Sequence, residues 1–179
     1  MTAQDDLLQL VPPPEGAEVE VDWPRFEEAL GVVLPDDYKW LVERYGPGSF
    51  NSFLYILQPV SPFHPTRLVE SADRAAEILD ELRENGEKIP YETDELLPVG
   101  KTDNGDTLYW VTRPEVQPNS WTVVANGARN TEWPHFDGGI VAFLVAVLSG
   151  AHRVEIFPRD FQKAQPVFEG YPSPGARRR

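Results

Sequence analysis

The chain has 179 residues, of which 41% are hydrophobic and 11% aromatic, and its formal net charge is −13 at pH 7. This length and composition can supply one hydrophobic core, so the sequence predicts a single soluble domain. Because 29 acidic residues oppose only 16 lysines and arginines, the surface repels phosphate backbones, which argues against direct binding of nucleic acid. The same charge speeds encounter with a basic protein, although acidity that serves solubility alone explains it equally well.

No cysteine occurs in the chain, so the sequence offers no disulfide, no thiolate nucleophile and no thiol ligand for a metal. The opening residues, MTAQDDLLQLVPPPEG, lack the basic start and the long apolar run of a secretory signal peptide. The longest apolar run, 140–148, is too short to cross a bilayer and indicates a buried helix. We therefore expect a cytoplasmic protein that does not bind membranes.

Residues 1–17 contain three consecutive prolines and a glycine among acidic and polar residues. This composition favours an extended N-terminal arm over a packed element. Leu7, Leu8 and Leu10 are the side chains through which the arm could still contact the domain.

Residues 22–46 predict two consecutive helices. Asp22 is suited to cap the first helix, which ends at Gly31, and Pro35 suits the first turn of the second. In the second helix, four apolar side chains recur at the spacing of one buried face: Tyr38, Leu41, Val42 and Tyr45. Gly46 supplies the left-handed residue that ends it.

The middle of the chain predicts one strand and one long helix. Residues 51–57 are aromatic and aliphatic without polar alternation, which indicates a covered strand or an edge strand. Thr66 is a candidate cap for a helix that closes at Asn85-Gly86. Apolar residues repeat along it at helical spacing: Leu68, Ala72, Ala75, Leu79 and Leu82.

The second half of the chain predicts an antiparallel sheet. Asn104-Gly105 is the preferred pair for a type I′ turn, so 97–102 and 107–112 should be adjacent antiparallel strands. Leu108 and Trp110 would share one face of the second strand, with Tyr109 and Val111 on the other. Further elements are expected in order: a strand at 121–125, a short strand within 131–136, a helix at 140–148 and a loose tail at 159–179.

Signals for chemistry are weak in this sequence. The three histidines lie far apart, without a partner at metal-binding spacing: His64, His135 and His152. Asp103, Asn104 and Asp106 resemble part of a calcium loop but lack its alternate ligands and its terminal glutamate. We expect no catalytic residue, no metal site and no cofactor. A hydrolase built on Asp103, Asp106 or His135 would need a deep polar pocket that joins them.

Two features favour binding of a protein instead. Trp40 lies at the margin of the buried stripe, where a partly exposed tryptophan is a typical interface anchor, and its alternative role is packing against the N-terminal arm. Acidic residues in three segments are candidate contacts for a basic partner: Asp36, Asp37, Glu92, Asp94, Glu95, Asp103 and Asp106. Asp36 and Asp37 could equally stabilise the start of a helix, and Asp103 and Asp106 could equally belong to a solvated turn.

Several motifs occur in a recognisable order. Residues 27–50, EEALGVVLPDDYKWLVERYGPGSF, contain a helix ending in Leu-Gly, a Leu-Pro-x-x-Tyr step and a helix ending in Tyr-Gly. LLPVGKTDNGDTLYW, NSWTVVAN and TEWPHF follow, and then the apolar helix and Ile156-Phe157-Pro158. This order resembles the SUKH superfamily, which includes fungal regulators of cell-wall synthesis, over residues 18–158.

The resemblance implies an α+β fold in which an antiparallel sheet of about four to six strands packs against flanking helices. It also implies a domain at 18–158, between the arm at 1–17 and the tail at 159–179. Many bacterial members are immunity proteins that neutralise toxins, often nucleases, and the superfamily has no agreed catalytic residues. The leading hypothesis is therefore a toxin-neutralising immunity protein whose partner is a cognate toxin domain. The alternative is a regulatory scaffold that binds a host protein.

Overall fold

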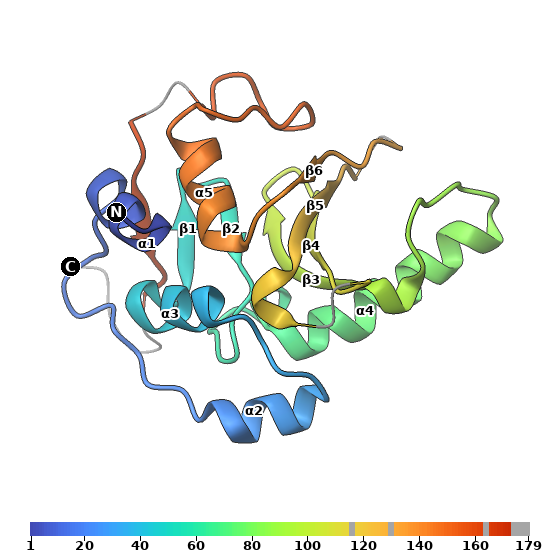
Figure 1. The fold of residues 1–179 in the computed structure, drawn as a ribbon, viewed down its shortest axis with the longest axis horizontal. Coiled ribbons are helices and arrows are strands. Elements are labelled where there is room, and N and C mark those ends of the chain that lie inside the picture. The colour runs from blue at the N-terminus through green and yellow to red at the C-terminus, as the bar shows by residue number, and fades with distance from the viewer. Residues whose placement is uncertain (115–116, 129–130, 163–164, 173–179) are drawn as a thin grey trace.

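A computed structural model describes residues 1–114, 117–128, 131–162 and 165–172 (Figure 1). The fold is α+β, as predicted, with one antiparallel seven-stranded sheet in the order β6-β5-β4-β3-β2-β1-β7, which is slightly more than the expected four to six strands. The helices are α1 (Ala3–Leu10), α2 (Trp23–Leu30), α3 (Asp36–Tyr45), α4 (Leu68–Glu84) and α5 (Ile140–Leu148). The strands are β1 (Gly48–Phe50), β2 (Leu54–Ile56), β3 (Leu96–Thr102), β4 (Thr107–Val111), β5 (Thr122–Asn126), β6 (His135–Phe136) and β7 (Phe168–Gly170). Three 3-10 turns complete it: η1 (His64–Thr66), η2 (Thr93–Glu95) and η3 (Pro118–Ser120).

The helix pair α2 and α3 forms where the sequence predicts it. Asp22 accepts a hydrogen bond from the Arg25 N–H at 3.3 Å, and Gly31 ends α2 with a φ of 78°. The predicted stripe of α3 is buried, and two of its hydroxyls donate to carbonyls of distant segments: Tyr38 to Leu57 at 2.8 Å, and Tyr45 to Val11 at 2.7 Å. These bonds satisfy polar atoms that would otherwise be buried at a cost.

The antiparallel pairing of β3 with β4 confirms the predicted hairpin, but the prediction of a type I′ turn is wrong. Type I′ needs left-handed conformations at two residues, whereas Gly105 has a φ of 87° and Asn104 is not among the residues with positive φ. The Gly105 N–H donates to the Thr102 carbonyl at 3.0 Å, and the Thr102 N–H donates to the Asp106 carbonyl at 3.0 Å. The loop is therefore one residue longer than expected.

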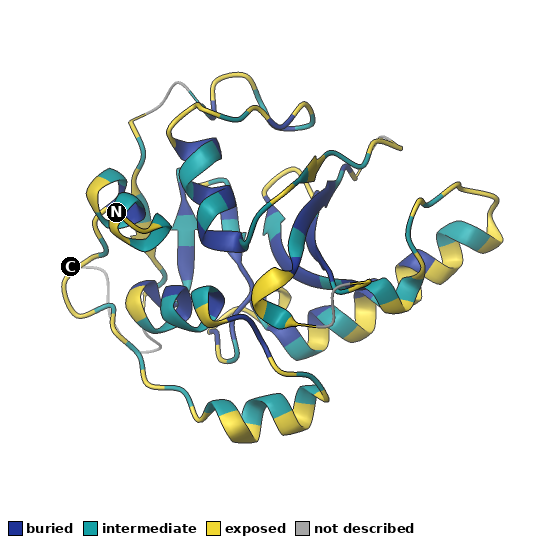
Figure 2. Cartoon of the chain, viewed as in Figure 1, coloured by how far each residue is buried: buried dark blue, intermediate teal, exposed yellow. Residues whose placement is uncertain are grey.

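The sheet has two differently covered faces. The inner face packs against α1, α3 and α5, and it carries Leu108 and Trp110. The outer face packs against α4, and it carries Tyr109 and Val111, which confirms the predicted division of β4. In Figure 2, α5 and the central strands are mostly buried, while α4 has an exposed side along its length.

Three sequence expectations need correction. The N-terminal segment is not wholly extended, because residues 3–10 form α1, which packs on α5 with Leu7 fully buried. Residues 51–57 do not form one strand, because Asn51 and Ser52 adopt positive φ and turn the chain between β1 and β2. Within the expected loose tail, residues 168–170 form β7, which pairs with β1. The predicted domain limits at 18 and 158 stay a prediction, and Arg177, Arg178 and Arg179 lie outside the described residues.

Candidate functional site

A concentration of exposed carboxylates lies where the C-terminal half of α4 and the loop that follows it meet η2. We call it the acidic surface, and its residues are all exposed: Asp80, Glu81, Glu84, Glu87, Glu92 and Asp94. Arg83 joins the two elements, since its guanidinium donates to the Thr93 hydroxyl and the Tyr91 carbonyl. The Thr93 hydroxyl in turn donates to Asp80 at 2.6 Å. These contacts place the acids of the helix beside those of the turn.

Local hydrogen bonds hold the three predicted acids of η2 in place. Glu92 and Glu95 form a reciprocal capping box, in which the Glu92 N–H donates to the Glu95 carboxylate at 2.8 Å. Asp94 forms an ion pair with Arg113 at 3.2 Å. Glu95 is half-buried, so Glu92 and Asp94 are the two of the three that face solvent.

An aromatic pair borders the acidic surface. The ring centroids of Tyr91 and Trp133 lie 5.9 Å apart, and Trp133 lies equally far from Tyr109 on the outer face. Burial, and then the negative charge of Glu95, raises the pKa of Tyr91, so its hydroxyl stays protonated at neutral pH. Half-buried aromatic side chains beside charged ones are typical of protein interfaces.

The predicted acids of α3 have mainly structural roles. Asp36 exchanges two 2.8 Å hydrogen bonds with Asn119, through its backbone N–H and its carboxylate. The Asp37 carboxylate accepts the Val141 N–H at 3.1 Å and so caps α5. Burial raises the pKa of Asp37, although the N–H groups that it accepts oppose this shift. Asp37 is therefore an internal helix cap and presents little of its charge to a partner.

Trp40 is half-buried, and its ring packs edge-on against Tyr45 with centroids 6.2 Å apart. It shares a shallow pocket with residues 18–20, which is the packing against the N-terminal region that the sequence left open. Part of the indole remains accessible there. Its role as an interface anchor stays a prediction.

Asp103 and Asp106 lie at the far end of the hairpin from η2. The intervening strand β3 has seven residues, so it spans roughly 20 Å. Asp106 is buried and accepts hydrogen bonds from the Thr102 hydroxyl at 2.7 Å and the Ala128 N–H at 3.1 Å. The structure thus does not bring the eight predicted residues together: Glu92, Asp94 and Glu95 form one group, and the others lie elsewhere.

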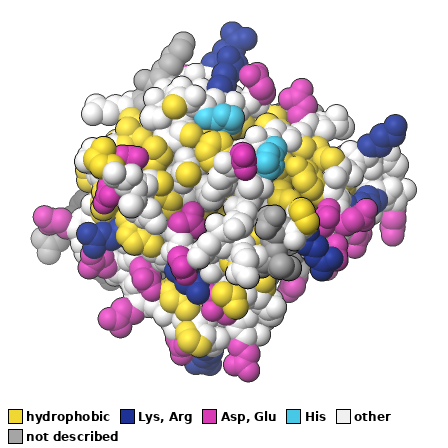
Figure 3. All heavy atoms as spheres, viewed as in Figure 1, with side chains coloured by type: hydrophobic (Ala, Val, Ile, Leu, Met, Phe, Trp, Pro, Cys, Tyr) yellow, Lys and Arg dark blue, Asp and Glu magenta, His cyan; other side chains and the backbone are white. Residues whose placement is uncertain are grey.

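Sequence reasoning missed four of the six residues of the acidic surface: Asp80, Glu81, Glu84 and Glu87. Asp80 and Glu84 recur at i and i+4 in α4, and Glu87 follows three residues after the helix ends, close in sequence to the acids of η2. That spacing was the available signal. On the face of the molecule in Figure 3, acidic side chains gather at the right, over this end of α4.

The described residues contain no cluster of histidines and carboxylates that could hold a metal ion. Two of the histidines have separate local partners: His64 lies 3.3 Å from an Arg67 nitrogen, and His135 lies 2.8 Å from the Thr122 hydroxyl. His152 packs edge-on against Phe136. In the part of the chain that the structure describes, no helix is long and apolar enough to cross a membrane.

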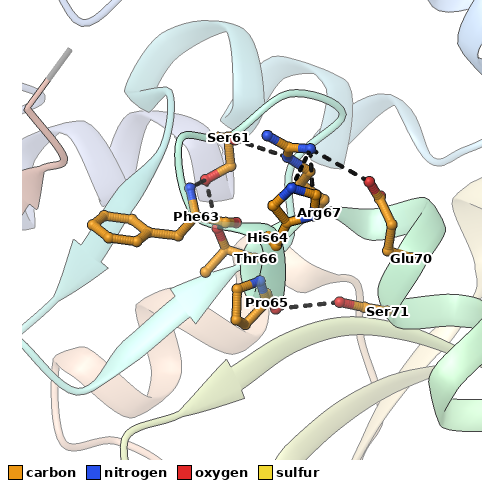
Figure 4. A network of polar contacts seen from close by, with 8 residues as sticks. All are labelled: Ser61, Phe63, His64, Pro65, Thr66, Arg67, Glu70 and Ser71. Atoms are coloured by element: carbon orange, nitrogen blue, oxygen red, sulfur yellow. Dashed lines mark hydrogen bonds and ion pairs between the residues drawn. The ribbon is translucent and has the colours of Figure 1, made fainter. Parts of the chain in front are cut away.

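A second surface is an apolar groove of about 770 Å³ between α2 and the segment 58–67. Its walls include Phe26, Val60 and Tyr171, with Val60 79% exposed. Figure 4 shows the polar network that holds the segment. The sequence predicts that Thr66 caps α4, and this prediction is wrong. The Thr66 hydroxyl instead forms hydrogen bonds within the segment, to Ser61 and to the Phe63 carbonyl.

Comparison with known protein families identifies a match that covers most of this fold. The SMI1 / KNR4 family (SUKH-1) matches residues 20–140, which include α2 to β6 and the whole acidic surface. The chain belongs to this family. The match confirms the resemblance that the motif order indicates. No curated protein matches the chain.

Proposed function

We propose that this SUKH-1 protein is a cytoplasmic immunity protein that neutralises a cognate toxin by binding it, without catalysis of its own. The observation that carries the proposal is the acidic surface, in which carboxylates of α4 and η2 adjoin the aromatic pair Tyr91 and Trp133. Membership of the family supports a protein-binding role. A nuclease-type toxin fits this surface, because an enzyme that holds nucleic acid presents a basic active face.

The acidic surface would act in two steps. Its field first attracts the basic face of the toxin, which raises the association rate at low salt. The half-buried rings of Tyr91 and Trp133 then supply apolar contact area, since aromatic side chains carry much of the binding energy at interfaces. Occlusion of the toxin's substrate-binding face would be enough for neutralisation.

Co-expression tests the function directly. The chain is produced in cells together with the toxin domain encoded beside its own gene, and survival is scored against the toxin alone. We expect the wild-type chain to restore growth. Death of the cells while both proteins are soluble would contradict the immunity proposal.

Charge reversal locates the surface. In the acidic-surface variant, Glu81, Glu84 and Glu87 become lysine, because these exposed side chains form no hydrogen bond or ion pair among the described residues. The control reverses Glu15, Glu155 and Asp160, which lie outside α4 and η2 and change the net charge equally. Of these three, Glu155 forms an exposed ion pair with Arg153 at 3.9 Å, which contributes little to stability. We expect only the first variant to lose protection.

The apolar groove favours a second candidate, a regulatory scaffold that binds a host protein. A groove with exposed Val60 and walls of Phe26 and Tyr171 suits an apolar segment of a constant partner rather than a basic toxin face. Purification of the tagged chain from its own cytosol distinguishes the two. A scaffold recovers the same partner without any toxin gene, and Val60→Asp abolishes that recovery while the acidic-surface variant does not.

A further inference from the structure

A cleft of about 500 Å³ separates α4 from the outer face of β3 and β4. The helix side of the cleft has the apolar side chains Ile78 and Leu82, next to the polar Ser71 and Arg74. The opposite wall comes from the sheet, with Lys101, Thr107 and Tyr109. The volume of this mixed polar and apolar cleft matches the size of a small-molecule site.

Lys101 is the unusual residue of this cleft. It lies in β3, where its neighbours across the ladder are Tyr55 and Thr107, and its side chain is half-buried. Burial lowers the pKa of the Lys101 ammonium, and desolvation is the sole cause of the shift. Among the described residues, no carboxylate lies within ion-pair distance of its Nζ. A partly desolvated cation without a counter-ion is unfavourable, and an anion that enters the cleft would relieve that cost.

Other groups in the lining define the ligand further. Burial raises the pKa of Tyr109 to about 12, so its hydroxyl remains a neutral hydrogen-bond donor. Arg74 also lines the cleft, but its charge is paired with Glu77 at 3.1 Å, and Glu87 adds a negative charge that disfavours a highly charged ligand. The exposed acids of α4 repel large polyanions from the mouth, whereas a small anion meets mainly the local field of Lys101.

We propose that this cleft binds a small organic anion, whose carboxylate or phosphate group contacts the Lys101 ammonium and whose apolar body lies against Ile78, Leu82 and the Tyr109 ring. Glu87 is the one residue of the cleft lining that also belongs to the acidic surface. Lys101 is not part of that surface, so anion binding can be tested whether or not the protein neutralises a toxin.

Three probes test the proposal on the full chain by two-dimensional NMR titration. Benzoate and phenyl phosphate carry an anionic group on a ring, and benzyl alcohol has the ring without the charge. We expect saturable shifts of the Thr107, Tyr109 and Asn126 amides with one or both anions and none with benzyl alcohol. Equal binding of benzyl alcohol, or no saturable shift with either anion, would overturn the proposal.

Two matched variants separate the cleft from general charge effects. Lys101→Met keeps the aliphatic stem and removes the charge, and we expect it to weaken anion binding about tenfold or more, as for loss of a charge-assisted hydrogen bond. Lys88→Met makes the same charge change at an exposed lysine outside the cleft lining, and it should keep the wild-type affinity. An equal loss in both variants would contradict the site.

The thermal midpoint of Lys101→Met gives a second readout. Because Lys101 has no counter-ion among the described residues, this variant should unfold at the same temperature as the wild type or higher. A large drop would indicate that Lys101 holds the fold instead. In that case the variant is not informative about binding, and the proposal is tested by comparing the wild-type amide shifts with the two anions and with benzyl alcohol.

Discussion

The two faces of the sheet differ in how completely helices cover them. The inner face is sealed by α1, α3 and α5 into one large core with Trp110 and Phe143 fully buried. The outer face has α4 alone, over a small cluster with Leu79, Tyr109 and Val124. The cleft and the acidic surface both lie on this outer side. We infer that the inner face provides most of the packing stability, and that the outer face is the side available to bind a partner.

Matched truncations on the two faces should give the largest difference in stability. Leu144 in α5 and Leu79 in α4 are both at most 1% exposed, so Leu→Ala removes the same group from each core. A cavity in the dense inner core cannot collapse, so we expect a loss of about 4–5 kcal/mol for Leu144→Ala. Beside the open cleft, Leu79→Ala should cost about 2–3 kcal/mol, because α4 can relax.

Urea unfolding of the wild type and of both variants measures these losses as free energies of unfolding. Equal losses, or a greater loss for Leu79→Ala, would mean that the outer face is packed as rigidly as the inner one.

The N-terminal helix α1 contributes to the inner core. Leu7 is fully buried between α1 and the rest of the core, so Leu7→Ala should lower the free energy of unfolding by about 2–4 kcal/mol. Its half-buried neighbour Leu8 gives a control, for which we expect about 1 kcal/mol or less. If both substitutions were nearly silent in urea unfolding, α1 would be a dispensable arm.

Asp37 connects α3 to α5 and predicts a pH effect of smaller size. Because burial raises the pKa of Asp37 in the folded protein, the folded state binds this proton more tightly than the unfolded chain. The contribution of Asp37 to stability therefore falls as the pH rises from 3.8 through its raised folded pKa. Asp37→Asn keeps an acceptor oxygen for the Val141 N–H but does not titrate.

The measurement is the thermal midpoint of both proteins at steps between pH 3.5 and neutrality, a range set by the direction of the shift. Wild type should gain stability relative to Asp37→Asn as the pH is lowered. Asp36→Asn, on the same helical turn, should leave most of that gain intact, because the charge of Asp36 is only the smallest of the causes that act on the pKa of Asp37. If the thermal midpoint of the wild type instead fell relative to that of Asp37→Asn as the pH is lowered, the folded state would favour the ionised carboxylate.

The smallest expected change in stability is that of the acidic-surface variant. Exposed side chains away from caps and ion pairs shift the free energy of unfolding by about 0.5 kcal/mol or less. Glu81, Glu84 and Glu87 should therefore tolerate reversal to lysine in urea unfolding. A loss of more than about 1 kcal/mol in the free energy of unfolding would mean that these side chains stabilise the fold, so that a binding defect could not be assigned to the surface alone.

The elements that the sequence predicts well are those fixed by local chemistry. Asp22 and Gly31 bound α2, the apolar spacing of α3 identifies its buried face, and the Asn104-Gly105 corner identifies neighbouring strands. The elements that it misses depend on distant contacts. Leu7 is buried because α5 covers it, and Asp37 becomes a cap because α5 begins beside it, 104 residues later.

The candidate site was predicted in part for the same reason. Glu92, Asp94 and Glu95 are adjacent in sequence, so their grouping needed no tertiary information. The acids of α4 join them only because Arg83 and Asp80 bind the η2 segment at Thr93. Asp106 was mistaken for a surface group because one of its hydrogen-bond partners, the Ala128 N–H, lies 22 residues away.

If the outer, acidic side of the sheet binds the partner, its charge should control the rate of association with the cognate toxin domain. Stopped-flow measurements over a range of salt concentrations determine that rate. We expect reversal of Glu81, Glu84 and Glu87 to slow association at least about tenfold at low salt, while reversal of Glu15, Glu155 and Asp160 changes it much less. Equal slowing by both variants, or unchanged rates at low salt, would contradict binding by this side of the sheet.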